Sequence, residues 1–267
     1  MCKVYPHLNL NSLSLAPGIQ DPENSQISRP PTKHKSLKDI VEETYAWCSA
    51  ALIGFSETER IKQLRQRWKA IKPLTSKFHA HAVEPVPRVL TEASMHFAER
   101  GNFAYCLCIS SFLATRIDPY KAAAPFAPQR VKGMLMIAKL LVNATAVESE
   151  GGTEPGALVS AKTMHGKISQ VMRETDQATV CQVLLELVVR YAPAAHSRKW
   201  SVLYEAQDLL SDLESLQGRE TGDALVKAFL RNPGGIEEKQ FFEQAVLQPI
   251  HRLSELCLDI MDSEFGS

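Results

Sequence analysis

The sequence lacks the charge imbalance that would suggest a polyanionic partner. Thirty Lys and Arg residues balance thirty Asp and Glu residues in a chain of 267. A neutral chain has no overall attraction for nucleic acid or for an anionic membrane, so only a local patch could bind either one. We therefore expect no nucleic-acid partner and no membrane partner.

Long hydrophobic runs are also missing. The longest, Met134 to Val142, is interrupted by Lys139 and is far shorter than the roughly 20 residues of a membrane-spanning helix. The first residues contain no apolar core of a secretory signal. The six cysteines fall mostly within apolar helical patterns, which favours buried, reduced thiols over a disulfide framework. These features predict an intracellular protein, either cytoplasmic or nuclear.

Strand patterns and the common catalytic motifs are absent from the sequence as well. No β-branched alternation bounded by turns is found. There is no Gly-x-Ser-x-Gly nucleophile motif, no phosphate-binding Walker loop and no dinucleotide fingerprint. The sequence therefore indicates no catalytic residue and no cofactor, and it leaves open whether the protein is an enzyme.

What the sequence does contain is the composition of a soluble globular protein, with 45% apolar and 22% charged residues. Residues 1–35 are rich in Pro, Ser, Asn and Gln, which predicts a disordered tail. Residues 36–267 carry helical patterns and are expected to form a single all-helical domain. A Gly-containing loop marks a candidate subdomain boundary near 148–156.

Local signals predict where the helices begin and end. Ser56 and Glu59 have the spacing of a capping box, and Pro73, Asp118-Pro119 and Pro193 are expected to end helices. The expected helices, in chain order, cover residues 36–53, 56–72, 85–100, 102–117, 129–147, 157–173, 176–191, 197–216, 220–231 and 236–262.

The most informative segment begins near Thr91 and predicts an antiparallel helix pair. Ala93 and Phe97 are followed by Gly101-Asn102-Phe103, a spacing typical of tetratricopeptide repeats. In such pairs small residues allow close approach, aromatic residues fill the seam and glycine permits the tight reversal. The repeat period is not regular along the chain. The fold class is therefore all-α, either a tetratricopeptide-like array or an irregular helical bundle.

A family resemblance rests on four short segments, Asp118-Pro119-Tyr120, Pro125-Phe126, Arg130-Val131-Lys132-Gly133 and Ile137–Leu141. This part of the chain, about residues 85–150, resembles the helical C-terminal region of fungal proteins with a SET domain, often accompanied by a MYND zinc finger. In that family the helical region packs behind a lysine methyltransferase domain and shapes a substrate cleft. The chain lacks the family's Asn-His-Ser-Cys and Cys-x-x-Cys motifs, so the resemblance implies a helical module without catalytic residues.

Histidines form the first candidate site. His79 and His81, with Glu84 close by, could share a metal ion if their segment is extended, with His96 or a cysteine as a third ligand. No further ligand motif accompanies them, and the alternative is a pair of polar residues on an ordinary loop. We therefore predict no metal site and keep the three histidines as candidate binding residues.

Two further groups are candidates for binding. Arg130 and Lys132 follow a proline-rich connector at the start of a helix, where a carboxylate or phosphate could bind; alternatively they pair with Asp118 or Glu99. Tyr120 and Phe126 could line an apolar groove or belong to the core. The helix after Ser56 also has a basic side, which either meets an acidic partner or is a solvated face.

Three hypotheses about function follow. The leading one is a helical interaction module that binds a peptide or partner protein in a groove between helix pairs near residues 85–147. The second is a small-molecule enzyme of fungal specialised metabolism, or a methyltransferase-related protein, with a pocket inside the bundle. The third is a structural subunit that associates through the helix near 236–262.

Overall fold

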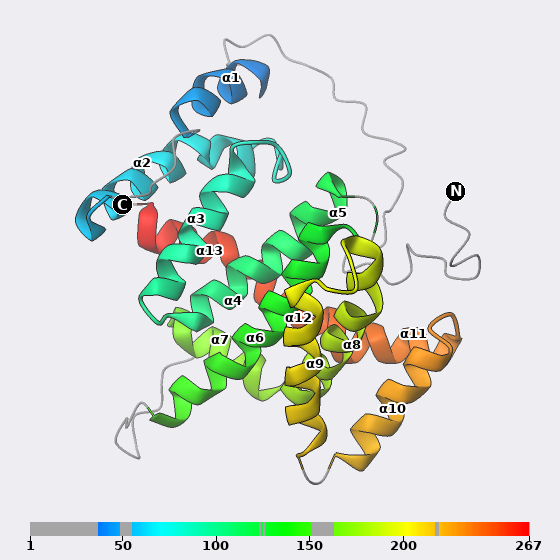
Figure 1. The fold of residues 1–267 in the computed structure, drawn as a ribbon. Coiled ribbons are helices and arrows are strands. Elements are labelled where there is room, and N and C mark those ends of the chain that lie inside the picture. The colour runs from blue at the N-terminus through cyan, green and yellow to red at the C-terminus, as the bar shows by residue number, and fades with distance from the viewer. Residues whose placement is uncertain are drawn as a thin grey trace.

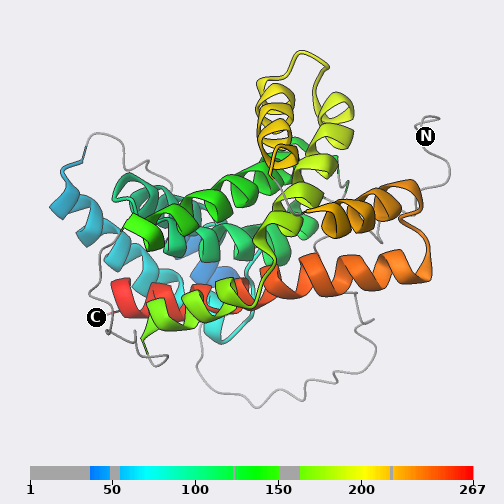
Figure 2. The same cartoon turned by 90° about the horizontal axis from the view of Figure 1, so that it is seen from below.

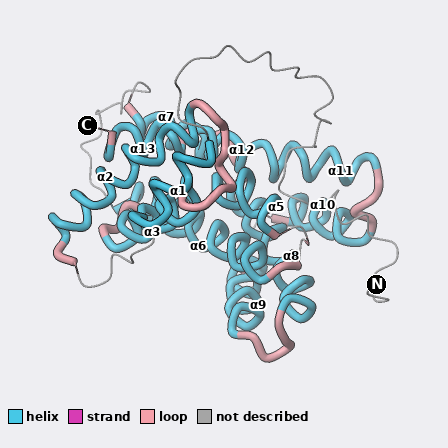
Figure 3. Tube along the Cα trace, turned by 90° about the horizontal axis from the view of Figure 1, so that it is seen from above, coloured by secondary structure: helices cyan, strands magenta, loops and turns pink. Residues whose placement is uncertain are grey.

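The computed structural model describes residues 37–48, 55–122, 124, 126–150, 163–216 and 219–266. Every regular element in these ranges is helical, which confirms the all-α prediction (Figures 1 and 3). The predicted tail, residues 1–35, lies outside them.

The elements are α1 (Leu37–Cys48), α2 (Glu57–Ser76), α3 (Val86–Glu99), α4 (Phe103–Phe112), the π-helical turn η2 (Leu113–Ile117), α5 (Asp118–Lys121), α6 (Pro128–Glu150), α7 (Met164–Arg173), α8 (Gln177–Ala195), α9 (Ser201–Glu214), α10 (Glu220–Arg231), α11 (Ile236–Phe242), the π-helical turn η3 (Glu243–Leu247), α12 (Gln248–Glu255) and α13 (Cys257–Phe265).

Several helices begin where short polar side chains can cap them. The Ser56 hydroxyl accepts a hydrogen bond from the backbone N–H of Glu59 at 3.3 Å. The Asn102 and Asp176 side chains accept in the same way at the starts of α4 and α8. These bonds satisfy N–H groups that have no partner within the helix. Between α3 and α4, Gly101 has a φ of 73°, a conformation that favours glycine and lets the chain reverse.

The prolines correct the predicted helix ends. Pro73 and Pro193 lie inside α2 and α8, each within the last four residues of its helix. A proline there removes one backbone hydrogen bond, but the adjacent Leu74 and Ala192 are fully buried. The apolar contacts of these neighbours hold the last turns in place.

Pro119 does not end the helical run either. It lies in the first turn of α5, where its missing N–H is not needed. Both π-helical turns end two residues before a proline, η2 before Pro119 and η3 before Pro249. Because proline cannot donate to the carbonyl four residues earlier and its ring pushes that carbonyl away, the preceding turn can widen into a π turn.

The core is organised around α4, which Figure 1 shows near the middle of the molecule. All residues from Tyr105 to Phe112 are buried, as expected for a helix that is apolar all round. It packs against α3, α6, α12 and α13. One continuous apolar core extends from Cys48 to Phe265 and includes all five described cysteines as free thiols.

Contacts between distant parts of the sequence make the fold a bundle. The last helix, α13, packs against α2, and α12 packs against α4. In a repeat solenoid each unit contacts only its neighbours, so these contacts support the irregular bundle over the array. The α3–α4 pair is present as predicted, with its two helices in contact.

The second half of the chain adds α8, which packs between α6 and α9. By length and composition α8 could cross a membrane, but 61% of its most apolar window is buried inside the protein. A core helix of a soluble protein meets the same criterion. The helix before the expected loop near 148–156 runs on to Glu150, and residues 151–162 lie outside the described part of the chain.

The single helix expected over 236–262 is instead a succession of four elements. It is interrupted by η3 and again at Leu256, a turn residue between α12 and α13. Figure 2 shows this segment, in orange and red, running along one side of the molecule. Its buried residues, including Phe242, Val246 and Ile260, belong to the core.

Candidate functional site

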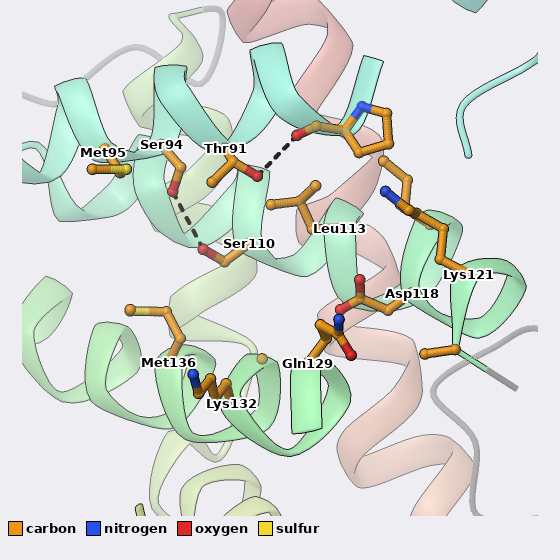
Figure 4. Close-up of a pocket in the computed structure, with 14 residues that line it drawn as sticks. Thr91, Ser94, Met95, Ser110, Leu113, Asp118, Lys121, Gln129, Lys132 and Met136 are labelled. Carbon is orange, nitrogen blue, oxygen red and sulfur yellow. Dashed lines mark hydrogen bonds between the residues drawn. The ribbon is translucent and has the colours of Figure 1, made fainter. Parts of the chain in front are cut away.

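A cleft of about 450 Å³ lies between α3 and α6, with α4 and η2 behind it and α5 at one end (Figure 4). This volume falls within the usual range for ligand sites. Carbon-rich side chains form most of its wall. The apolar lining residues are Pro87, Met95, Leu113, Ile117, Ala122 and Met136.

Two methionines lie at the open edge of the cleft. Met95, on α3, is 58% exposed and Met136, on α6, is 49% exposed. Figure 4 shows them on opposite helices at the same end of the cleft. A methionine side chain is flexible and polarizable, so a pair of them can adapt to apolar groups of different shape.

The hydroxyl groups of the wall have partners within the protein. Thr91 donates to the carbonyl of Pro87 at 2.8 Å. The Ser94 hydroxyl lies 3.1 Å from the Cys106 sulfur and 3.5 Å from the Ser110 hydroxyl. Because these groups are already paired, this part of the wall can accept apolar groups without leaving a buried hydroxyl unsatisfied.

A carboxyl group lies at the α5 end of the cleft. Burial raises the pKa of Asp118 to about 6, although Arg130 and Lys121 act in the opposite direction. Gly133 of α6 lies against it, since a Cβ atom there would be 3.4 Å from an Asp118 carboxylate oxygen. An added Cβ atom would therefore make an ordinary contact there, and the position of this glycine inside an apolar helix, next to Asp118, is the sequence signal that could have indicated the site.

Arg130 is buried, whereas Lys132 is exposed. Arg130 is 8% exposed and donates to the carbonyl of Ala122 at 3.3 Å. Burial lowers its pKa, and the nearby Asp118 and Tyr191 partly offset this effect. Lys132 instead lines the cleft and is exposed, with its Nζ 5.8 Å from the centre of the Trp200 ring. The charges of Arg130 and Asp118 thus act on each other's pKa, and Lys132 lies exposed at the surface.

The three candidate histidines do not line the cleft. The rings of His79 and His81 lie 6.1 Å apart between α2 and α3, and His81 packs edge-on against Phe112. Burial, followed by the charge of His79, lowers the pKa of His81. In the described ranges no three His, Cys, Asp or Glu side chains are grouped closely enough to hold a metal ion.

His96, the third histidine, lies on α3 inside the core. It is 3% exposed and packs against Phe97 and Phe265. Burial lowers its pKa, and the charges of Arg100 and Arg60 act in the same direction. This environment favours the neutral imidazole, which is typical of a core histidine.

Two aromatic candidates lie outside the cleft lining as well. Tyr120 is 64% exposed on α5, and Phe126 is half-buried against the core. Of the seven residues predicted from the sequence, Lys132 alone lines the cleft, and the charge of Arg130 acts on the carboxyl group of Asp118. The sequence pointed to Asp118 only as a helix end and as a partner of Arg130.

The basic side of α2 is largely used for ion pairs within the protein. Arg60 pairs with Glu99, Arg67 with Glu92 at 2.7 Å, and Lys72 with Asp262 at 2.9 Å. A second hollow borders Arg65 and Lys69, but all of its lining residues lie on α2 alone. One helix face gives a ligand little enclosure, so the cleft beside α3 is the better candidate site.

The Asp118 carboxyl should make stability depend on pH. Its pKa is higher in the folded protein, about 6, than its ordinary value of 3.8, so the wild type loses stability as the pH rises from about 4 to 6. The Asp118→Asn variant avoids this loss. Relative to the wild type, its free energy of unfolding should rise by about 2.4 kcal/mol between pH 4 and pH 8.

Urea unfolding of both proteins at a series of pH values would measure this difference. Asp208→Asn, a change on the exposed face of α9, serves as the control. If the free energies of unfolding of Asp118→Asn and the wild type changed with pH by the same amount, the pKa of Asp118 would not be raised in the folded protein.

The chain was compared with protein-family models, curated proteins and solved structures. No protein-family model, curated protein or solved structure matches this chain.

Proposed function

We propose that the protein is a helical interaction module that binds a peptide segment of a partner protein in the cleft between α3 and α6. The observation that carries this proposal is the open, mainly apolar cleft with Met95 and Met136 at its edge. Grooves between helices commonly receive the apolar side of an amphipathic helix. Methionine-rich edges are typical of surfaces that adapt to such segments.

The chemistry of the wall favours binding over catalysis. Thr91, Ser94 and Ser110 are paired within the protein, and none of the histidines that the structure describes lines the cleft. These three hydroxyls are therefore paired with groups other than the adjacent base that activates a nucleophile in covalent catalysis. Apolar side chains of a peptide could replace water along the wall, with a gain of about 25 cal/mol for each Å² buried.

Peptide selection followed by a matched pair of variants tests this function. A displayed peptide library would be screened for binding to the purified full chain. The selected peptides would then be synthesised, and their affinities would be measured by calorimetry. Selected peptides should share apolar residues at helical spacing. The Met136→Glu variant should bind them at least about tenfold more weakly, because a carboxylate would have to be buried against apolar groups.

Val142→Glu provides the control on the same helix. Val142 is 46% exposed, close to the 49% of Met136, but it does not line the cleft. This variant should bind the peptides as the wild type does. A library that yields no peptide with helical spacing, or equal losses in both variants, would contradict the proposal.

A second candidate function is a site for a small molecule, as in an enzyme of specialised metabolism or a methyltransferase-related protein. The observation that favours it is Asp118, whose pKa of about 6 suits general acid–base chemistry. An anilinonaphthalene sulfonate dye can serve as the probe. Dye binding that Met136→Glu abolishes, together with a failed peptide selection, would favour this function over the first.

A further inference from the structure

The charges around the cleft mouth are unequal. Lys121 pairs with Glu84 at 2.5 Å. Burial raises the pKa of Asp118 to about 6, and the positive charge of Arg130 acts on the same carboxyl group. Lys132 is exposed at the mouth, and no carboxylate in the described part of the chain lies within ion-pair distance of it. The mouth therefore has a positive charge that no described carboxylate neutralises.

This charge continues onto the turn between α8 and α9. The Lys132 ammonium lies over the Trp200 ring, and the His196 ring stacks on the same tryptophan with 5.5 Å between ring centres. Arg198 and Lys199 directly precede Trp200 and are exposed. As for Lys132, no ion pair joins either of them to a described carboxylate. Trp200 thus links the cleft to a cationic cluster, defined here as Lys132, Arg198 and Lys199.

We infer that the bound segment carries acidic residues beside its apolar anchors, and that the cationic cluster receives them. This inference rests on the function proposed above and specifies the chemistry of the partner. The apolar cleft and the cluster lie side by side, so a segment seated against Met136 would continue toward Lys132, four residues earlier on α6. Complementary charge at the edge of an apolar site selects partners and fixes the direction in which they bind.

Lysine and arginine side chains are well suited to bind the acidic residues of such a segment at the edge of the cleft. Their long side chains can reach a carboxylate while the apolar stem remains against Trp200 or the cleft wall. Interactions of this kind at a solvated edge are individually weak and are screened by salt. The cationic cluster should therefore contribute moderately to the affinity for the bound segment. This contribution should weaken as the ionic strength rises, whereas the contribution of the apolar contacts should not.

Two forms of one selected peptide test the inference. One form carries glutamates beside the apolar anchors, and the other carries glutamines at the same positions. For the wild-type protein at low salt, the glutamate form should bind about threefold to tenfold more tightly. The difference should shrink at high salt, and the Lys132→Glu/Lys199→Glu variant should lose it.

Arg65→Glu/Lys69→Glu is the matched control, since it makes the same change in net charge on the outer face of α2. It should retain the preference of the wild type. Equal binding of the two peptide forms to the wild type, or equal loss in the control, would overturn the inference while leaving the peptide function intact. Failure of both forms to bind the wild type would instead overturn the proposed function.

Discussion

Replacing Trp68 by alanine is expected to lower the free energy of unfolding by about 3–5 kcal/mol. Trp68 is 1% exposed and lies on the face of α2 that packs against α13. Its indole N–H donates to the Asp262 carboxylate at 2.8 Å, across 194 positions of sequence. The substitution would leave a large cavity and would remove a hydrogen bond between α2 and α13, two helices that are far apart in the sequence.

Two further variants separate the contributions of Trp68. Phenylalanine keeps much of the ring volume but cannot donate to Asp262, so Trp68→Phe should cost less than the alanine variant, about 1–2 kcal/mol. Tyr204→Ala removes an aromatic side chain that is 52% exposed, and a change of less than about 0.5 kcal/mol is expected. Chemical unfolding measures all three. An equal effect of Trp68→Ala and Tyr204→Ala would disprove the packing described here.

The Arg67→Met variant is the second change with a large expected effect, a loss of about 3–5 kcal/mol. Arg67 is 2% exposed and donates to Glu92 at 2.7 Å. Burial raises the pKa of Glu92 even though Arg67 acts in the opposite direction. Without the guanidinium group, the half-buried carboxylate would lose its main compensation and would favour the protonated form more strongly.

The double variant Arg67→Met/Glu92→Leu should recover most of this loss. Replacing a buried ion pair by apolar side chains removes both desolvation costs together with the attraction. Thermal or urea unfolding of the wild type, both single variants and the double variant gives the interaction energy. Lys167→Met, which breaks an exposed pair with Asp259, should change stability little. If the double variant were no more stable than Arg67→Met, the loss would have to come from packing and not from the unpaired charge.

The helix starts show what local sequence can predict. Ser56, Asn102 and Asp176 can each satisfy a backbone N–H within three residues, so their effect does not depend on the rest of the fold. The prolines show the limit of this approach. Pro73 and Pro193 were expected to end helices, but buried neighbours such as Leu74 hold one more turn. That contribution comes from distant parts of the chain and leaves no local signal.

The candidate site shows the same division. Arg130 and Lys132 are separated by about 200° around a helix, so they cannot face the same way. The sequence identified both, but it could not tell which of them the fold would bury. The histidines were chosen for their chemistry, yet His96 became a core residue and His81 packed on Phe112. Burial in the fold raises the pKa of Asp118, and no local signal in the sequence shows how deeply that carboxyl group is buried.

By itself, the sequence determined the all-α class, most of the helix starts and the α3–α4 pair, because capping and helical periodicity act over a few residues. Only the tertiary structure decided that the helices close into a bundle, through contacts such as those of α13 with α2. It also decided that Thr91, Asp118 and Met136 line one cleft. Such contacts depend on how whole helix faces pack together, and this packing joins residues whose separation in the sequence follows no fixed pattern.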